Sequence, residues 1–212
     1  MVIVGICGAS GSGKSTLAQE IKDSLTCSAV IIGQDCYYKN QAFLPFEERK
    51  RINYDKPDIF DYSELLSDIA LLASGEPVTQ KGYDYAQHIR ADSDTLIYPP
   101  DVLILEGIHI FHDDRLKKAM SLKVYMHVDV DVCLLRRIQR DITQRGRSIN
   151  SIADQYMATV KPMYEEYVSK YIRDADFAVM RGGRNRMAID AISAYISAKL
   201  LAEKFVMEDG LE

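Results

Sequence analysis

A short run near the start of the chain has the residue types and the spacing of a phosphate-binding loop. The run from Gly8 to Ser15 fits the pattern G-x-x-x-x-G-K-[ST] in full. Glycines let the backbone curl so that successive N–H groups point at phosphate oxygens, and the helix that follows adds the positive end of its dipole. Lys14 can then reach the β- and γ-phosphates, and the Ser15 hydroxyl can bind Mg²⁺.

The pattern therefore predicts a site for a nucleoside triphosphate with magnesium. The residues expected to form it are Gly8, Ala9, Ser10, Gly11, Ser12, Gly13, Lys14, Ser15 and Thr16. An acidic residue elsewhere agrees, because the apolar run 102–105 is followed directly by Glu106. In proteins with such a loop, the neighbouring strand presents a carboxylate to the metal and its water shell. We expect Glu106 and Ser15 to serve the same magnesium ion.

Arginines cluster between residues 136 and 147. Arg136, Arg137 and Arg140 share one face of a predicted helix, and Arg145 and Arg147 follow it. Guanidinium groups spread positive charge over the oxygens of a phosphoryl group in transfer, so this segment is predicted to be a lid over the triphosphate. The alternative is a solvated basic face or a nucleic-acid patch, which the net charge of −5 disfavours.

Carboxylates and aromatic residues gather in a different part of the sequence. Asp35 closely follows the apolar run 29–32, a strand whose end we expect to lie beside the phosphate loop. We predict that Asp35 is the base that takes a proton from an attacking hydroxyl. Asp55 can accept hydrogen bonds from a sugar diol, and tyrosines can pack on a base ring. The other polar and aromatic residues of this region are Tyr54, Tyr83, Tyr85, His88 and Arg90. Together they suit a neutral, polyhydroxylated, aromatic acceptor.

The elements that must position these residues alternate between short apolar runs and helical patterns. The predicted strands cover 2–7, 29–32, 102–105, 122–128 and 177–180. The predicted helices cover 15–25, 62–73, 113–120, 132–144, 149–171 and 186–205. Apolar strands separated by helices indicate an α/β fold with a doubly wound, five-stranded parallel sheet. Two insertions, at about 36–60 and 78–98, interrupt this rhythm, and the second has the pattern of a β-hairpin.

Composition narrows the class of protein further. The 212 residues, 47% apolar and 27% charged, fit one globular domain over the whole chain. No segment approaches about 18 consecutive apolar residues, so we expect no membrane span. Four cysteines without a CxxC pair indicate reduced thiols in a cytoplasmic protein.

Taken in order along the chain, these motifs resemble the uridine kinase (uridine–cytidine kinase) family. The matching segments are Gly8–Ser15, Gln34–Tyr38, Asn53–Pro57, Tyr83–Arg90, Leu105–Ile108, Arg136–Ser148, Gln155–Met163 and Arg181–Asn185. The resemblance implies a P-loop NTPase fold with a β-hairpin insertion for the acceptor and an arginine lid over about 136–156. It also implies ATP-dependent phosphorylation of uridine or cytidine at the 5′-hydroxyl, with Mg²⁺, in pyrimidine salvage.

The resemblance assigns a role to each matching position. Asp35 resembles the general base, and Asp55 and Arg137 the ribose ligands. The residues that resemble readers of the base edge are Tyr83, His88, Arg147 and Gln155, with Tyr54 and Tyr85 packing on the ring. Arg140 and Arg145 resemble the lid arginines, and Arg181 and Asn185 belong to the adenine-side loop. The family further implies a homotetramer and feedback inhibition by CTP or UTP, with neither nucleic acid nor membrane as a partner.

The sequence departs from the family pattern at three places. Gly82 follows Gln80-Lys81 where the family has an apolar residue and a proline, and we expect it to loosen that strand. The stretch 168–173 lacks the usual proline, which predicts a longer helix. His109 replaces an aliphatic residue and is expected to fill space near the site rather than to catalyse.

Two other readings stay open at this point. One is a related kinase for another alcohol, such as pantothenate or ribulose phosphate. The other is a triphosphate-binding regulator without catalytic activity, although Asp35, Lys14 and Glu106 are all present.

Overall fold

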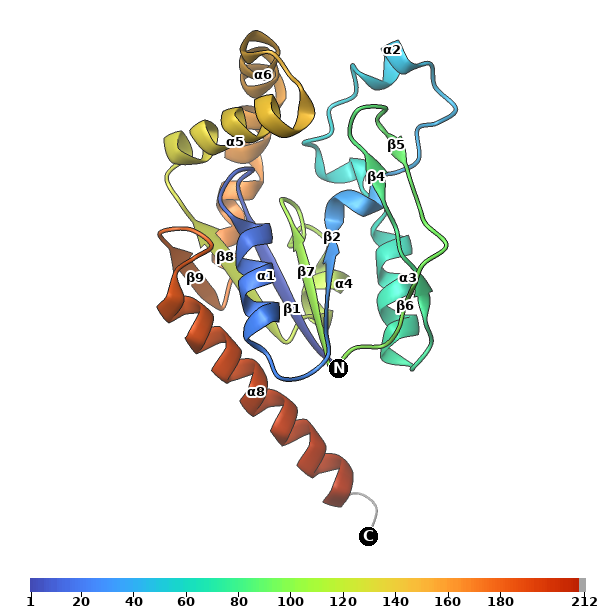
Figure 1. Cartoon of the computed structure of the whole chain (residues 1–212), viewed down its shortest axis with the longest axis vertical. Helices are drawn as coiled ribbons and strands as arrows, with labels where there is room; N and C mark the ends of the chain where they lie inside the picture. Colours follow the sequence, from blue (N-terminus) through green and yellow to red (C-terminus); the bar gives the residue numbers. More distant parts are fainter. Residues whose placement is uncertain (210–212) are drawn as a thin grey trace.

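A five-stranded parallel sheet forms the centre of the molecule, seen in a computed structural model that describes residues 1–209 (Figure 1). Its strands lie in the order β2-β7-β1-β8-β9. Their bounds are β1 Val2–Gly8, β2 Ala29–Gly33, β7 Val102–Gly107, β8 Leu122–His127 and β9 Phe177–Met180. Every neighbouring pair is parallel, which confirms the predicted α/β sheet.

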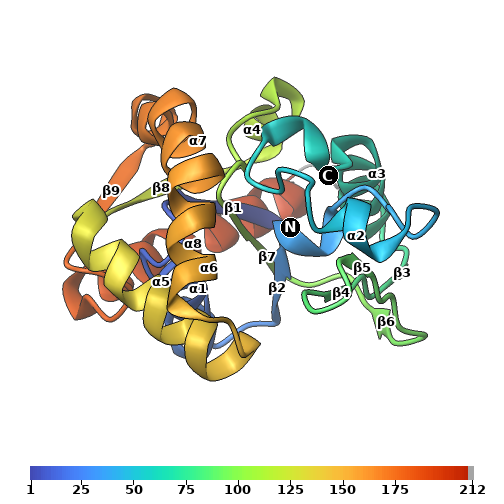
Figure 2. The ribbon, with the colours of Figure 1, turned by 90° about the horizontal axis from the view of Figure 1, so that it is seen from above.

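Helices cover both faces of this sheet, as Figure 2 shows from above. On one face, α1 (Lys14–Ser24) and α8 (Arg186–Asp209) pack on side chains such as Val4 and Ile104. On the other face, α3 (Tyr62–Ala73) and α4 (Asp114–Ala119) pack on residues such as Leu103. Because successive side chains of a strand point to opposite faces, each continuous apolar run contributes residues to two separate cores.

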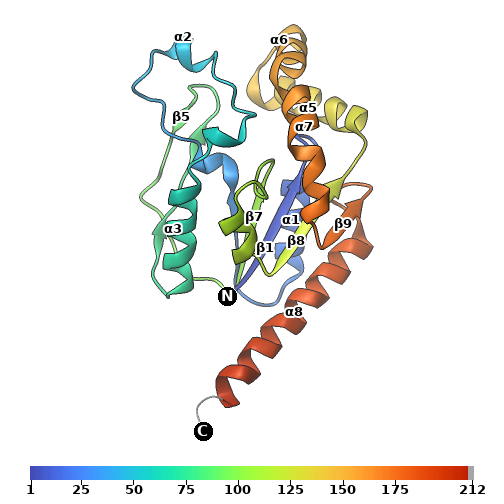
Figure 3. The same cartoon turned by 180° about the vertical axis from the view of Figure 1, so that it is seen from behind.

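Most of the remaining helices stand above the carboxyl ends of the strands, whereas η4 (Val168–Asp174) packs against β1 and β8 (Figures 1 and 3). The longest of them is α5 (Val130–Arg145), which ends at Gly146 in the left-handed conformation, φ 62°. The others are η1 Gln34–Tyr37, α2 Phe46–Arg49, η2 Pro57–Ile59, α6 Ile149–Gln155, η3 Tyr156–Val160, α7 Lys161–Glu166 and η4 Val168–Asp174. Within residues 1–209, none of the helices combines the length and the apolar composition needed to cross a bilayer.

The predicted second insertion is built from two short antiparallel ladders. The hairpin pairs β4 (Tyr83–Asp84) with β5 (Ile89–Arg90), and β3 (Val78–Thr79) pairs with β6 (Leu96–Ile97). Gly82 stands where the two strands approach closely, and a Cβ there would collide with the carbonyl oxygen of Ala91. The glycine is thus required by the close approach, while the expectation that it loosens the strand stays a prediction.

The helical region 149–171 is less regular than its sequence predicts. A turn of π-helix, η3, separates α6 from α7, and Pro162 stands near the start of α7. The α-helix stops at Glu166, because Tyr167 has φ −121°, and a 3-10 helix continues to Asp174. The predicted longer helix is therefore wrong as an α-helix, although the segment stays helical.

The position of β2 also differs from the expectation. Asp35 was expected at the end of the strand beside the phosphate loop, but β7 lies between β2 and β1. The neighbour of the loop strand is therefore the strand that carries Glu106. Asp35 reaches the site from one strand further out, through η1.

Candidate active site

The phosphate loop joins β1 to α1 and its glycines are conformationally required. Gly11 and Gly13 have φ values of 86° and 94°, in the left-handed region that side chains disfavour. A Cβ on Gly11 would also collide with the carbonyl oxygen of Cys133, so α5 packs directly against the loop. Lys14 is 8% exposed, and its Nζ donates to the carbonyl of Ala9, 3.1 Å away across the loop. The loop therefore forms a phosphate cradle with the ammonium group of Lys14 inside it.

Two oxygen donors meet beside this loop. The Ser15 hydroxyl donates to Glu106 Oε1 at 2.9 Å. Burial raises the pKa of Glu106, and the positive charge of Lys14 opposes that rise. Among residues 1–209, no three His, Cys, Asp or Glu side chains gather into a metal site of their own. The predicted pair Ser15 and Glu106 does lie together, and a hydroxyl with a carboxylate is the donor set that Mg²⁺ prefers when phosphate oxygens complete its shell.

Asp35 lies in η1 and is held by the hairpin. Tyr85 Oη donates to Asp35 Oδ2 at 2.9 Å. The guanidinium of Arg145 lies over the ring of Tyr85, 4.1 Å from its centroid. The predicted base, ring-packing residue and lid arginine therefore form one chain of contacts that bridges α5 and the hairpin.

Asp55 faces the opposite wall of the same region. It is 8% exposed, and its Oδ2 accepts a hydrogen bond of 2.8 Å from Thr159 Oγ1 of η3. Burial raises the pKa of Asp55, and the positive charge of Arg137 opposes the rise. Asn53 Oδ1 accepts from the Asp55 backbone N–H at 2.9 Å, which fixes the turn that presents the carboxylate.

Arg137 connects the phosphate loop to the predicted base readers. It is 5% exposed; its Nη1 donates to Ser10 Oγ at 2.8 Å and its Nη2 to Gln155 Oε1 at 3.0 Å. The same Gln155 oxygen accepts from Arg147 Nη1. The structure thus brings Arg137, Arg147 and Gln155 into one polar network.

A buried carboxylate that the sequence analysis did not single out organises the arginines. Asp141 on α5 is fully buried, with ion pairs of 3.7 Å to Arg137 and 2.8 Å to Arg140. Arg145 and Arg147 each lie 3.6 Å from it. The signal in the sequence was one acid among five arginines, since a carboxylate at that place can hold guanidinium groups together.

The aromatic residues of the two insertions pack into one cluster. Tyr38, which sequence reasoning missed, lies 5.3 Å from Tyr54 and 4.7 Å from Tyr83, ring centre to ring centre. The imidazole of His88 stacks on Tyr54 at 5.0 Å, and burial lowers the pKa of His88. The predicted ring-packing and base-reading residues Tyr54, Tyr83 and His88 therefore share one wall.

The predicted adenine-side loop packs against the phosphate loop from β9. Arg181 has φ 67°, and Asn185 Nδ2 donates to the carbonyl of Met180 at 2.9 Å. A Cβ on Gly183 would collide with the carbonyl oxygen of Gly13. The loop therefore lies within contact of the cradle, and Asn185 has a clear structural part in closing it.

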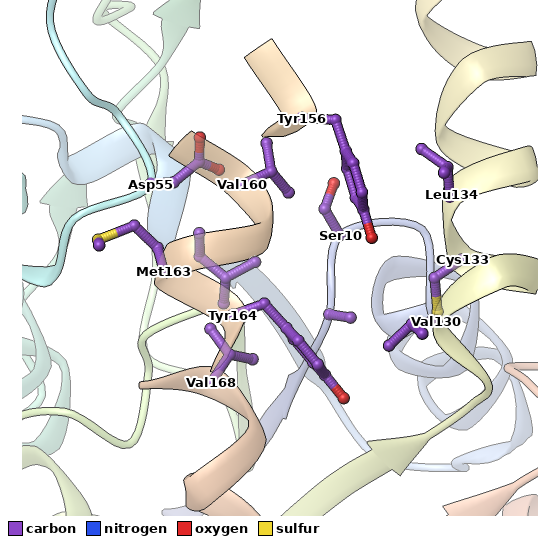
Figure 4. Close-up of a pocket in the computed structure, with 12 residues that line it drawn as sticks. Ser10, Asp55, Val130, Cys133, Leu134, Tyr156, Val160, Met163, Tyr164 and Val168 are labelled. Atoms are coloured by element: carbon purple, nitrogen blue, oxygen red, sulfur yellow. The ribbon is translucent and has the colours of Figure 1, made fainter. Parts of the chain in front are cut away.

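A small, mostly apolar pocket lies beside the loop. Figure 4 shows the rings of Tyr156 and Tyr164 pointing toward Val130 and Cys133 of α5, with Asp55 at the far side. Among the predicted site residues, only Ala9, Ser10 and Asp55 line it. The pocket therefore adjoins the predicted sugar end of the site rather than the base readers.

Known proteins resemble this chain in sequence and in fold. The model of the phosphoribulokinase / uridine kinase family matches residues 3–188. A uridine kinase of Limosilactobacillus reuteri (strain DSM 20016) is 46% identical over 196 residues, which cover 92% of this chain and 90% of that protein. A uridine kinase of Vibrio cholerae is 44% identical, over 94% of this chain and 96% of that protein.

Solved structures also resemble this chain in fold. The crystal structure of phosphoribulokinase from Rhodobacter spheroides superposes with a TM-score of 0.62 at 16% identity, covering 84% of this chain and 69% of that one. This likeness concerns the fold alone, whereas the family model and the curated relatives extend over most of the sequence. The chain belongs to the phosphoribulokinase / uridine kinase family.

Proposed function

We propose that this protein transfers the γ-phosphoryl group of ATP to the 5′-hydroxyl of uridine, and of cytidine, to give UMP or CMP and ADP. The observation that carries the proposal is the pair of carboxylates on the acceptor side, Asp35 and Asp55, set beside a complete phosphate loop. The relatives named uridine kinase, at 44–46% identity over most of both chains, support the same substrate.

In this proposal Asp35 accepts the proton of the 5′-hydroxyl as the oxygen attacks phosphorus. Tyr85 now donates to Asp35, so the nucleoside would displace or share that hydrogen bond. Lys14 and the arginines on α5 stabilise the negative charge that spreads over the phosphoryl oxygens. Arg140 and Arg145 are the lid residues, held near one another by Asp141.

Magnesium would be held by Ser15 and Glu106, whose two oxygens lie 2.9 Å apart. When bound, Mg²⁺ neutralises charge on the β- and γ-phosphates. A hydroxyl beside a half-buried carboxylate suits Mg²⁺ when phosphate oxygens complete its shell, so the residues present fit the ion.

Nucleoside recognition divides between two walls. Asp55 and Arg137 are proposed to bind the ribose hydroxyls, because a carboxylate accepts from both members of a diol. Tyr83, His88, Arg147 and Gln155 are proposed to read the base edge, while Tyr54 and Tyr85 pack on the ring. On the donor side, the loop 8–16 holds the phosphates and the Arg181–Asn185 loop borders the adenine.

The family resemblance supports three further proposals. The protein works in pyrimidine salvage in the cytoplasm; it assembles as a homotetramer; and CTP or UTP inhibits it by feedback. It acts as one domain, with the two insertions and the 136–156 segment as acceptor site and lid.

A coupled assay of ADP release over a panel of alcohols tests the proposal. Uridine and cytidine should support turnover, while pantothenate and ribulose phosphate should not. Asp35→Asn serves as the inactive control and should remove nucleoside-dependent release. ADP release that no nucleoside stimulates, or that a different alcohol stimulates more strongly, would contradict the proposal.

A further inference from the structure

Beneath the acceptor site, a fully buried histidine joins several segments of the chain. His109 follows β7 and is 0% exposed. Its Nε2 lies 2.6 Å from the backbone oxygen of Asp55, and its Nδ1 lies 3.0 Å from Tyr171 Oη of η4. His112 Nδ1 lies 3.1 Å from the same phenolic oxygen. Both ring nitrogens of His109 therefore take part in hydrogen bonds.

The partners of His109 fix its tautomer. The Asp55 backbone oxygen can only accept, so Nε2 must carry the proton and donate to it. A neutral imidazole has one N–H, which leaves Nδ1 to accept from the Tyr171 hydroxyl. The Tyr171 oxygen can then accept from His112 Nδ1–H. The hydrogen bonds thus run in one direction, from His112 through Tyr171 and His109 to Asp55.

His109 is also attached to the segment that carries Asp35. Its backbone N–H donates to Gln34 Oε1 at 2.9 Å, and Gln34 is itself 1% exposed. Tyr62 Oη donates to the His109 carbonyl at 3.2 Å. The residue before Asp35 and the backbone of Asp55 are consequently attached to one buried residue.

The hydrogen bond between His109 and the Asp55 carbonyl affects where the Asp55 carboxylate points. That side chain leaves a turn fixed on one side by Asn53 Oδ1 and on the other by the carbonyl bonded to His109. Without the Nε2–H donor, a buried carbonyl would lose its partner and the turn would shift toward water or another donor. A shift of the turn moves both carboxylate oxygens together.

We propose that His109 is a positioning residue for the sugar site: its Nε2–H holds the carbonyl of Asp55 and thereby aims the Asp55 carboxylate at the 2′- and 3′-hydroxyls of the nucleoside. This inference rests on the proposed function. It makes ribose selectivity depend on a residue that does not touch the substrate. Tyr171 holds the other side of the ring, because its hydroxyl donates to Nδ1.

The test compares uridine with 2′-deoxyuridine as acceptors for wild type, His109→Leu and His109→Gln. Leucine fills the space without a donor, whereas glutamine can place an N–H near the position of Nε2. His109→Leu should lower the ratio of kcat/KM for uridine to that for deoxyuridine by about tenfold. His109→Gln should keep the ratio within about twofold of wild type, and the KM for ATP should stay unchanged in both.

Matched controls separate positioning from general damage. His127 is exposed at the end of β8, so His127→Leu and His127→Gln make the same changes away from the site. If His109→Leu does not fold, Tyr171→Phe decides. It removes the hydrogen bond that fixes the Nδ1 side of the ring, so the imidazole can tilt away from the Asp55 carbonyl, and the ratio should fall about twofold to fivefold. Thermal unfolding of each variant checks that it is folded.

The outcomes distinguish the inference from the proposed function. An active wild type, together with a folded His109→Leu variant that keeps the wild-type ratio, overturns the inference alone. Equal losses in the leucine and glutamine variants, or an unchanged ratio in Tyr171→Phe, overturn it as well. A wild type that does not phosphorylate uridine overturns the proposed function and the inference with it.

Discussion

The charge of Asp141 should matter far more than its size. Asp141→Asn keeps the shape but leaves four guanidinium groups around a neutral amide, at 2.8, 3.6, 3.6 and 3.7 Å. Removing one partner of a fully buried pair costs about 3–5 kcal/mol. Three of the arginines are 26–32% exposed, and water screens them, so we expect about 2–4 kcal/mol.

That free energy corresponds to a fall in Tm of roughly 5–15 °C for a chain of this length. Thermal unfolding of Asp141→Asn measures it, with Asp154→Asn on the exposed side of α6 as the control. The deficit should shrink when ATP and Mg²⁺ saturate the protein, because phosphate oxygens then supply the missing negative charge. A Tm within about 1 °C of wild type would show that the charge of Asp141 does not stabilise the fold.

Four further outcomes are expected. Asp35→Asn should lower kcat by roughly 10²–10⁴ with little change in ATP affinity, because it removes only the base. Arg140→Ala should lower kcat far more than it raises the nucleoside KM, while Arg147→Ala should mainly raise that KM. Asp55→Ala should bring uridine and deoxyuridine to similar kcat/KM, since the unpaired carboxylate costs deoxyuridine about 1–3 kcal/mol in wild type. Burial lowers the pKa of His109 to about 4. As the pH falls from 6.5 to 4, the imidazole is therefore protonated in the unfolded chain before it is protonated in the folded one, and wild type should lose stability relative to His109→Gln.

Steady-state kinetics with each substrate varied in turn checks the first three predictions, and urea unfolding across that pH range checks the fourth. Near wild-type turnover by Asp35→Asn would remove the base assignment. A pure KM effect at Arg140 would show that the lid is misplaced. An undiminished ribose preference in folded Asp55→Ala would take Asp55 out of the sugar site, and parallel pH profiles for the last pair would show that His109 titrates normally.

The sequence predicted the sheet and its cradle because those features depend on local pattern. Apolar runs define strands, and the glycine and lysine spacing of residues 8–15 defines the loop. The order of strands is a long-range property, and so the placement of Asp35 next to the loop strand was wrong by one strand. Glu106 was placed correctly because β7 does neighbour β1.

The networks around the candidate site were harder to predict, since they join residues far apart in the chain. Asp141 is one acid in a basic segment, and nothing in its own neighbourhood announces that four guanidiniums converge on it. His109 was expected to fill space, but it meets Asp55 and Tyr171, which are 54 and 62 positions away. The break after Glu166 depends on the backbone of Tyr167, which the sequence pattern did not reveal.

Identification of the reaction product shows whether the chain phosphorylates a nucleoside at its 5′-hydroxyl. Wild-type protein is incubated with uridine, ATP and Mg²⁺, and phosphorus and proton NMR spectra locate the new phosphate. A single monoester, coupled to the two 5′ protons of uridine, should form in step with ADP. Phosphate on another hydroxyl, or ADP formed only with inorganic phosphate, would contradict it.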